Sequence, residues 1–195
     1  MTAGLDKTAL RTRLRGLRRR LAVELPDAPQ RAAAHLPLDR LPPYRVFALY
    51  HPMGSEMDPT PLLGRLAQRH ARAVLPVAVE RHAPLIFRLW PHGGRLEPDA
   101  FGIPAPAPVM PALAPDLVIA PVLGFDRRGH RLGQGAGHYD RTLANLRARG
   151  PVFVIGLAYS GQEVAELPAE PHDARLDAIL TETAYIEVSP GPKGL

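Results

Sequence analysis

The chain has 195 residues, of which 46% are hydrophobic and 22% charged, so it is long enough to form one compact domain with a sizeable core. It contains no cysteine, which excludes disulfides, thiolate catalysis and thiolate-bound metals. The formal net charge is +5, mostly from arginine, and it indicates an anionic partner such as a nucleotide, a polyglutamylated or phosphorylated metabolite, or a nucleic acid. No apolar run is long enough to cross a membrane.

The first predicted element is an amphipathic helix over residues 5–22, where leucines recur at helical spacing. Lys7, Arg11 and Arg18 fall along one edge of the leucine stripe, so they are expected to point partly toward whatever the helix packs on. The remaining arginines are expected to point elsewhere: Arg13, Arg15, Arg19 and Arg20. Because arginines interrupt every possible apolar signal core and the segment lacks the serines of a transit peptide, we expect a cytoplasmic protein. A simple solvated helix remains the alternative interpretation of this segment.

Downstream of this helix, apolar segments that predict buried strands alternate with segments of helical periodicity. Strands are expected at 45–51, 71–79, 84–90, 116–125, 151–159 and 183–188, and helices at 61–70 and 139–148. Residues 101–115 are rich in proline and are expected to run extended over the surface. The alternation is typical of an α/β fold with a largely parallel, covered sheet. Without an internal repeat or a second core, we expect a single domain over residues 1–195.

The most informative segment is RLGQGAGHYDR, residues 131–141, in which glycines occupy every second position before a cluster of polar residues. Such glycines let the backbone approach a ligand closely, and successive N–H groups at the start of a helix can bind an anion. Arg131 and Arg141 bracket this segment, and Asp140 could meet a phosphate-bound Mg²⁺. The segment matches neither the P-loop nor the dinucleotide fingerprint. An ordinary strand-to-helix turn is the alternative.

Residues 121–143, PVLGFDRRGHRLGQGAGHYDRTL, closely resemble the signature of the 5-formyltetrahydrofolate cyclo-ligase family. Other elements follow in the family's order: Lys7 and Arg11, YHPMGSEMD at 50–58, FRLW at 87–90 with FGIPAP at 101–106, and the segment 167–182. The resemblance implies a three-layer α/β/α sandwich of Rossmann-like type with a mostly parallel central sheet. It also implies conversion of 5-formyltetrahydrofolate and ATP to 5,10-methenyltetrahydrofolate, ADP and phosphate, with Mg²⁺.

The resemblance assigns roles to residues in three groups. For ATP these are Lys7, Arg11, Arg131, Leu132, Gly133, Gln134, Gly135, Ala136, Gly137, His138 and Tyr139. For the folate they are His51, Glu56, Trp90, Gln134, Gly135, Ala136, Gly137 and His138. For the metal they are Asp140 and Asp173, with Asp177 as an alternative to Asp173. Trp90 could instead belong to the core. The chain departs from the family pattern at His138, which replaces a tyrosine, at Ala136, which replaces a glycine, and at Ala105, which replaces an acid.

The reaction explains why cations and N–H groups are needed where no nucleophilic side chain is evident. An N5-formyl group is an amide and a poor electrophile, and transfer of the γ-phosphoryl group to its oxygen makes that oxygen a good leaving group. The protein then has mainly to position the reactants and neutralise charge. Arg131 is expected to stabilise the phosphoryl group in flight, and Tyr139 to hydrogen-bond the formyl phosphate or stack on the ligand.

Two alternative functions remain open. One is a different enzyme that uses ATP or a sugar phosphate on the same general fold. The other is a non-enzymatic nucleic-acid binder that uses the arginine-rich helix, which would bind with a steep dependence on salt. The favoured interpretation predicts small-molecule partners, folate and ATP, with no nucleic acid and no membrane, and a monomer or weak dimer.

Overall fold

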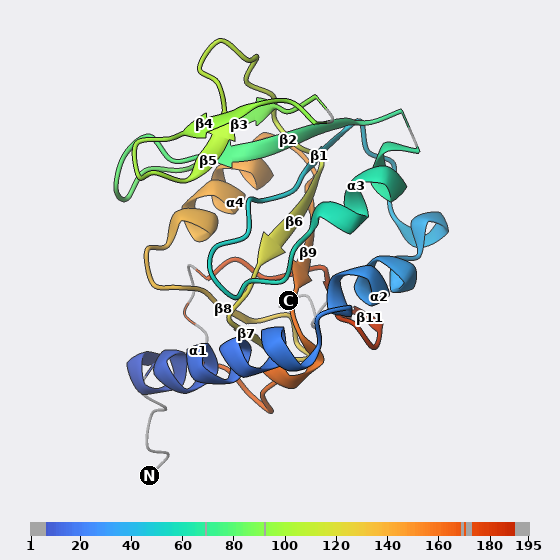
Figure 1. Cartoon of the computed structure of the whole chain (residues 1–195), viewed down its shortest axis with the longest axis vertical. Coiled ribbons are helices and arrows are strands. Elements are labelled where there is room, and N and C mark those ends of the chain that lie inside the picture. Colours follow the sequence, from blue (N-terminus) through green and yellow to red (C-terminus); the bar gives the residue numbers. More distant parts are fainter. Residues whose placement is uncertain (1–6, 69, 92, 169, 171–172, 190–195) are drawn as a thin grey trace, which may run out of the picture.

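A seven-stranded sheet forms the centre of the computed structural model, which describes residues 7–68, 70–91, 93–168, 170 and 173–189 (Figure 1). Its spatial order is β11 (Tyr185–Glu187), β10 (Ala178–Leu180), β9 (Phe153–Leu157), β6 (Leu117–Pro121), β1 (Val46–Ala48), β2 (Arg72–Val77) and β3 (Ile86–Leu89). The five inner strands are parallel, and β3 and β11 pair antiparallel at the two edges. The sheet is therefore mostly parallel, as expected.

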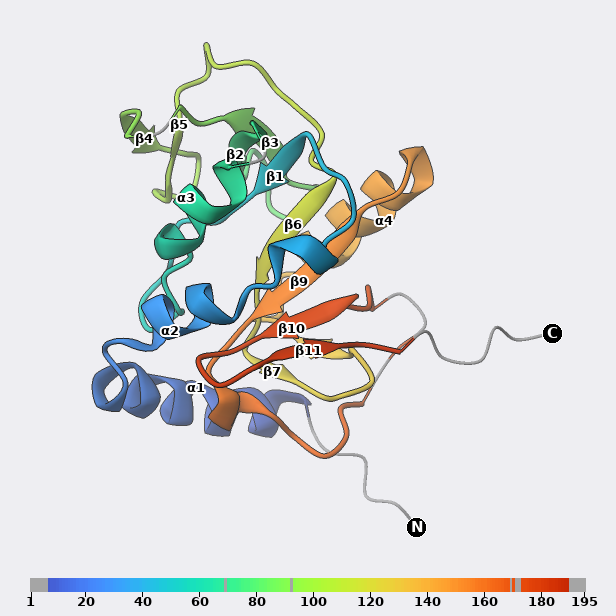
Figure 2. The same cartoon turned by 90° about the vertical axis from the view of Figure 1, so that its right-hand side faces the viewer.

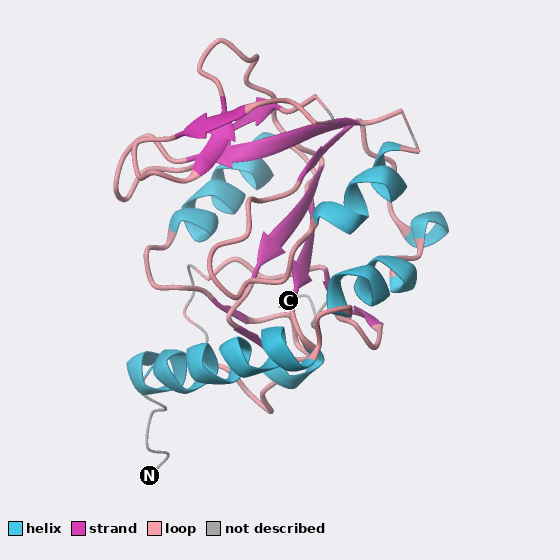
Figure 3. Cartoon of the chain, in the orientation of Figure 1, coloured by secondary structure: helices cyan, strands magenta, loops and turns pink. Residues whose placement is uncertain are grey.

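Helices cover both faces of this sheet, so that the sheet and its two helical layers make three layers (Figure 3). On one face lie α2 (Ala28–His35) and α3 (Thr60–Ala67), which contribute Ala32 and Leu62 to the larger hydrophobic cluster. On the other face lies α4 (His138–Arg149), which contributes Leu143 to a second cluster. The three-layer α/β/α architecture with a mostly parallel sheet is confirmed.

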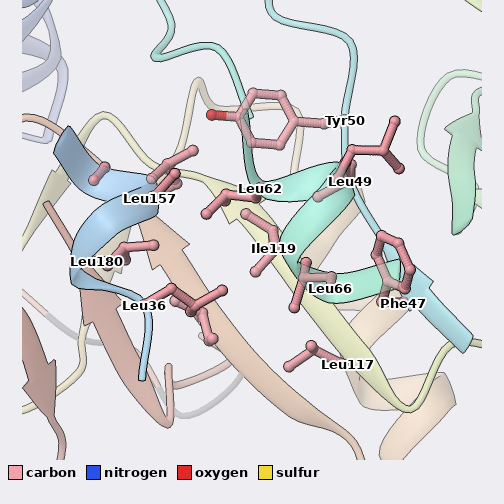
Figure 4. Packing of buried hydrophobic residues seen from close by; sticks show 14 of the residues in the cluster. Leu36, Phe47, Leu49, Tyr50, Leu62, Leu66, Leu117, Ile119, Leu157 and Leu180 are labelled. Atoms are coloured by element: carbon pink, nitrogen blue, oxygen red, sulfur yellow. The ribbon is translucent and has the colours of Figure 1, made fainter. Parts of the chain in front are cut away.

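The central strand β6 shows why these residues form a doubly covered sheet. Leu117 and Ile119 point into the cluster under α2 and α3, whereas Val118 and Ala120 point into the cluster under α4. All four residues are fully buried, so the strand is apolar at every position rather than at every second one. Figure 4 shows Leu117 and Ile119 packed beside Leu66 of α3. Burial of each such side chain contributes about 1.5–3 kcal/mol.

The first helix, α1 (Lys7–Glu24), lies at the end of the sheet toward which β6 and β9 point, beside β7 (Gly124–Phe125) and β8 (Arg131–Leu132) (Figures 1 and 2). Its leucines form a third cluster with this hairpin: Leu10, Leu14, Leu123, Leu132 and Leu167. Gly124 permits the close approach, because a Cβ atom there would lie 2.6 Å from a methyl group of Leu14. This packing fixes α1 against the segment that precedes the glycines.

The elements differ from the predictions mainly after the central strand. The predicted strand 116–125 is interrupted, since β6 ends at Pro121 and Gly124–Phe125 forms a separate antiparallel hairpin with β8. The glycine segment therefore follows this hairpin and not the central strand. Helix α2 was not predicted, because its apolar residues are alanine and proline and form no stripe of large side chains. Elements of three residues each were also not predicted: β10, β4 (Leu96–Pro98), β5 (Pro104–Pro106) and the 3₁₀ turns Leu38–Arg40 and Ser160–Gln162. The predicted first helix continues to Glu24, and its residues 5 and 6 lie outside the described part.

Candidate functional site

A cavity of about 620 Å³ opens at the carboxyl ends of the inner strands. Tyr50 and His51 line it just beyond β1, Ala78 beyond β2, and Val122 and Leu123 beyond β6. In the sheet, β1 lies between β2 and β6, and the crossover helices α3 and α4 lie on opposite faces. The cavity thus sits at the point where the winding of the sheet reverses, which is where open α/β sheets bind their ligands.

Nearly all of the predicted site residues line this one cavity: Lys7, Arg11, His51, Glu56, Arg131, Leu132, Gly133, Gln134, Gly135, Ala136, Gly137, His138, Tyr139, Asp140 and Asp173. They come from α1, from the loop after β1, from the glycine segment with the start of α4, and from the segment before β10. The structure therefore brings together, from four distant parts of the chain, the residues that the resemblance implied.

Two residues considered from sequence lie elsewhere. The indole nitrogen of Trp90 donates to the carbonyl of Gly94 at 3.1 Å, and the ring packs against the core beside a separate hollow lined by Leu63 and Leu89. The structure does not bring Trp90 to the cavity but places it against the core, which was the alternative to a contact with the folate. Asp177 is likewise absent from the cavity lining, because its carboxylate accepts hydrogen bonds from Arg147 and the N–H of Val154.

The glycine segment forms a backbone cradle at the start of α4. Gly135 and Gly137 have φ angles of 111° and 66°, which residues with a side chain rarely adopt. Gly137 is the residue that precedes the first turn of the helix. At Gly137 a Cβ atom would also lie 2.8 Å from a guanidinium nitrogen of Arg141. Within the described ranges, we find no backbone acceptor for the N–H groups of residues 134–139. Such a set of N–H groups at a helix N-terminus is suited to bind phosphate.

Arg131 lies in the wall of the cavity with its side chain only 3% exposed. Its Nη2 atom donates to Oδ1 of Asp140 at 2.5 Å, and its guanidinium lies 5.9 Å from the ring centre of Tyr139. Its Nε atom is buried and has no hydrogen-bond partner in the described part of the chain. The Arg131 side chain is thus a cation held in the wall of the cavity by its ion pair with Asp140.

Lys7, at the start of α1, is held by two carboxylates from the far end of the chain. Its Nζ atom donates to Glu170 at 2.6 Å and to Asp173 at 3.2 Å. Burial alone would lower the pKa of Lys7, but the hydrogen bonds that it donates to Glu170 and Asp173 raise it overall. Lys7 therefore stays positively charged at the edge of the cavity.

Two arginines of α1 hold the glycine segment directly. Arg11 donates from Nε to the carbonyl of Gly133 at 3.0 Å. Arg15 donates to the side-chain oxygen and to the carbonyl of Gln134, each at 3.1 Å. The prediction that Arg15 points away from the packed side is wrong. Residues four apart share one side of a helix, and the glycine segment passes close enough to be reached by both side chains.

Glu56 presents a buried carboxylate to the cavity from the loop after β1. Its side chain is 7% exposed, one oxygen lies 3.4 Å from Nη1 of Arg18, and the other accepts the N–H of Met53 at 3.0 Å. Burial, followed by the charge of Glu56, raises the pKa of Tyr139 well above its usual value. Tyr139 therefore remains a phenol at neutral pH and can donate a hydrogen bond into the cavity.

The cavity also contains apolar side chains that sequence reasoning did not assign. Met53 and Phe101 line it although they are 52% and 44% exposed. Phe101 is held at the rim by Asp99, whose carboxylate accepts the N–H of Phe101 at 2.8 Å and that of Ala78 at 3.1 Å. Its ring lies 6.4 Å from that of His138. The available signal was a large apolar residue beside a turn glycine in the FGIPAP element.

The sequence model of the 5-formyltetrahydrofolate cyclo-ligase family matches residues 3–182 of the chain. The chain belongs to this family. Among the relatives, a 5-formyltetrahydrofolate cyclo-ligase from Mycolicibacterium smegmatis is 38% identical over 144 residues, which are 70% of this chain and 73% of that protein. One from Haemophilus influenzae is 33% identical over 179 residues, which are 88% of this chain and 95% of the relative.

Two solved structures similar to this chain come from the same enzyme family. The 5,10-methenyltetrahydrofolate synthetase of Aquifex aeolicus has a TM-score of 0.75 at 28% identity, covering 97% of this chain and 96% of the other. That of Mycoplasma pneumoniae has a TM-score of 0.69 at 28% identity, covering 91% and 99%. The similarity extends over the whole sheet and its helices, so the chain is an enzyme of the cyclo-ligase family with that family's fold.

Proposed function

We propose that the protein closes the ring of 5-formyltetrahydrofolate to give 5,10-methenyltetrahydrofolate, and that ATP drives the reaction with release of ADP and phosphate. The observation that carries this proposal is the composition of the cavity at the carboxyl ends of the inner strands. It is lined by N–H groups and cations suited to phosphates, and also by a buried carboxylate and exposed apolar groups suited to a pterin. Membership of the cyclo-ligase family supports the same reaction.

The phosphate-binding part consists of the glycine segment and three cations. The N–H groups of residues 134–139 would bind the phosphate oxygens, and Lys7 and Arg11 would add charge from α1. Arg131 lies in the wall of the cavity with its side chain only 3% exposed. We assign Lys7 and Arg11 to ATP binding and Arg131 to the transferred phosphoryl group.

The folate-binding part lies around Glu56 and His51. A carboxylate can accept two N–H groups of a pterin at once, and Glu56 is the buried carboxylate that the loop after β1 presents to the cavity. Met53 and Phe101 supply apolar surface at the rim, suited to a flat ring system. His138 is fixed by a hydrogen bond between its Nδ1 atom and the carbonyl of Ala83 at 2.9 Å, so its ring is held in place beside Phe101.

The chemical step follows from these positions. The formyl oxygen attacks the γ-phosphorus of ATP, the bond to ADP breaks, and the formyl carbon becomes strongly electrophilic. N10 then bonds to that carbon and loses its proton, and phosphate leaves to complete the ring. Arg131 would stabilise the charge that develops on the phosphoryl oxygens, and the phenol of Tyr139 would donate to the formyl oxygen or the phosphate formed from it.

Asp140 and Asp173 fit a magnesium ion that is bound mainly through phosphates. Both line the cavity, and Oδ1 of Asp140 accepts the N–H of Ala174, the neighbour of Asp173, at 3.1 Å. The described residues hold no cluster of three or more acidic or histidine groups that would enclose a metal alone. Mg²⁺ at substrate phosphates keeps several waters and needs only one or two carboxylates. When bound, the ion would neutralise charge on the nucleotide phosphates.

One assay tests the proposal directly. The purified protein is mixed with 5-formyltetrahydrofolate, ATP and Mg²⁺, and the absorbance of methenyltetrahydrofolate is followed. We expect turnover that requires both substrates. A protein that is inactive here but active on another ATP-dependent substrate would support the rival enzyme, and steeply salt-dependent binding to DNA or RNA would support the nucleic-acid binder.

The remaining expectations belong to the same proposal. The central sheet, with a hydrophobic cluster on each face, supports one domain that binds both substrates. No helix among the described residues is long and apolar enough to span a bilayer. We propose a cytoplasmic enzyme that works as a monomer or weak dimer, and sedimentation of the purified protein tests the assembly state.

A further inference from the structure

We propose that Arg18 of α1 is a positioning residue for the folate. It holds the carboxylate of Glu56 in place and leaves that carboxylate able to accept hydrogen bonds from the folate. This inference rests on the proposed function, in which Glu56 binds the pterin. Arg18 itself does not line the cavity, so it would act through Glu56 and not by touching a ligand.

The burial of Arg18 needs an explanation. The residue is 6% exposed, although arginine is almost never fully buried unless it is paired. Its Nε atom donates to the hydroxyl of Ser55 at 3.2 Å, and its Nη1 atom donates to Oε1 of Glu56 at 3.4 Å. Its two neighbours on the helix, Arg19 and Arg20, are exposed. Both side-chain contacts of Arg18 are thus made with the loop after β1.

Glu56 is equally constrained on its own side. Its side chain is 7% exposed, and Oε2 accepts the N–H of Met53, while the N–H of Glu56 donates to the carbonyl of Met53 at 3.2 Å. These contacts hold the carboxylate within a closed turn. Removing one partner of a buried ion pair leaves the other charge uncompensated, so loss of Arg18 should disturb the position of Glu56.

The distance between the two charges matters for binding. Charge-assisted hydrogen bonds between nitrogen and a carboxylate are usually about 2.7–2.9 Å long, whereas Arg18 lies 3.4 Å from Glu56. Each carboxylate oxygen has two lone pairs, so the contact with Arg18 leaves acceptor capacity on Glu56. Glu56 can therefore accept N–H groups from the cavity side.

The arrangement also connects the two halves of the site. Arg18 and Arg11 lie seven positions apart and therefore on the same side of α1, and they reach two different loops. Arg11 contacts the glycine segment, and Arg18 contacts the loop that carries Glu56. One rigid helix thus sets the position of the proposed folate acceptor relative to the proposed phosphate cradle.

A double-mutant cycle separates positioning through Glu56 from general structural support. The variants are Arg18→Met, Glu56→Gln and the two combined, with Arg19→Met as a control for the loss of an exposed arginine from the same helix. Each is measured for kcat, for the folate KM and the ATP KM, and for Tm. We expect Arg18→Met to raise the folate KM about tenfold or more while the ATP KM changes less than about twofold. In the Glu56→Gln background the same change should raise the folate KM less than about twofold.

Arg18→Lys serves as the conservative rescue, because it keeps the charge but cannot reach Ser55 and Glu56 together. We expect its folate KM to lie between those of wild type and Arg18→Met, and its effect also to vanish in the Glu56→Gln background. If Arg18→Met does not fold, the lysine variant alone completes the cycle. Equal effects in both backgrounds, or equal rises in the KM of both substrates, would overturn the inference. An inactive wild type would instead overturn the proposed function, so the two failures are distinguishable.

Discussion

The guanidinium of Arg131, before the glycines at 133–137, lies 2.5 Å from the carboxylate of Asp140, which follows them. The pair couples the candidate phosphoryl-stabilising cation to a candidate metal ligand. A nucleotide phosphate would give Arg131 a second anionic partner, and Mg²⁺ would give Asp140 a second cationic one. The two groups are thus placed so that one charged ligand, a metal nucleotide, satisfies both.

Replacing Arg131 by alanine should lower kcat far more than it weakens nucleotide binding. The charge on the phosphoryl oxygens develops during transfer, so a group aimed at it stabilises the transition state more than the ground state. We expect kcat to fall about 100-fold or more, and nucleotide affinity to change less than about fivefold. Steady-state kinetics and a separate titration with ADP measure the two effects. Arg127→Ala is the control, since Arg127 is exposed and pairs with Glu163 away from the cavity. An unchanged kcat would remove Arg131 from the mechanism.

Loss of Lys7 and Arg11 together should raise the ATP KM by about tenfold or more, which corresponds to about 1.4 kcal/mol, because both line the cavity and are proposed to bind the phosphates. The matched control removes two exposed arginines of the same helix, Arg13 and Arg19, and should change this KM less than about twofold. Arg15 is unsuitable as a control because it contacts the glycine segment. Equal effects from both pairs would indicate diffuse electrostatic attraction in place of specific contacts.

The sequence predicted the fold where periodicity extends over a full element. The first part of the strand predicted at 116–125 corresponds to β6, and the leucine stripe of the first helix corresponds to α1. The prediction from sequence failed where contact with a distant segment of the chain determines the local structure. The two residues of β7 have no periodicity, and they become a strand because they pair with β8. Likewise, the spacing of leucines put Arg15 off the packed side, and only the path of the glycine segment brings Gln134 to it.

The candidate site was predictable mainly through the specific block at 121–143. Residues that act through shape were harder to predict. The local signal for Phe101, an apolar residue beside a turn glycine, is weak, and its position depends on the backbone N–H groups that Asp99 accepts in the folded chain. Trp90 shows the opposite error, because a large aromatic residue in a strand fits a ligand contact and a core position equally well. Its hydrogen bond to Gly94 and its packing against the core distinguish the two.

Replacing Asp173 by asparagine should raise the Mg²⁺ concentration that gives half-maximal activity. The carboxylate lines the cavity, and loss of its charge weakens the attraction for a cation by an expected factor of about ten. Asp177→Asn is the matched control, because Asp177 binds Arg147 and a backbone N–H outside the cavity. It should lower Tm and leave the Mg²⁺ requirement unchanged. The reverse pattern would give the metal role to Asp177.

Glu56→Gln should weaken binding of the folate and leave binding of ATP unchanged. An amide of the same shape offers one acceptor in place of two and turns a donor toward the pterin N–H groups. We expect the folate KM to rise about tenfold or more, with the ATP KM within about twofold. Asp58→Asn is the control from the same loop, since Asp58 binds Thr60 at the start of α3 and does not line the cavity. A rise in the ATP KM alone would place Glu56 on the nucleotide.

The stability of the hairpin that precedes the glycine segment should depend on pH through Asp126. This carboxylate is fully buried and accepts the N–H groups of Arg128, His130 and Leu167. Burial alone would raise the pKa of Asp126, but the hydrogen bonds from Leu167 and His130 lower it overall. A group whose pKa is lower in the folded than in the unfolded chain stabilises the fold above the unfolded value, about 3.9, and this contribution is lost as the pH falls through the folded pKa.

Asp126→Asn tests this dependence. At pH 7 the variant should lose about 1–3 kcal/mol of unfolding free energy, because the amide cannot accept all of these N–H groups and turns a donor toward one of them. As the pH falls below about 3.9, the wild type should lose its advantage while the asparagine variant does not titrate. Urea unfolding of both proteins from pH 7 to pH 3 measures the difference, with the exposed Asp39→Asn as a control expected to stay within about 0.5 kcal/mol. A difference that stays constant over this range would mean that packing, and not the charge of Asp126, stabilises the hairpin against which α1 and the glycine segment are set.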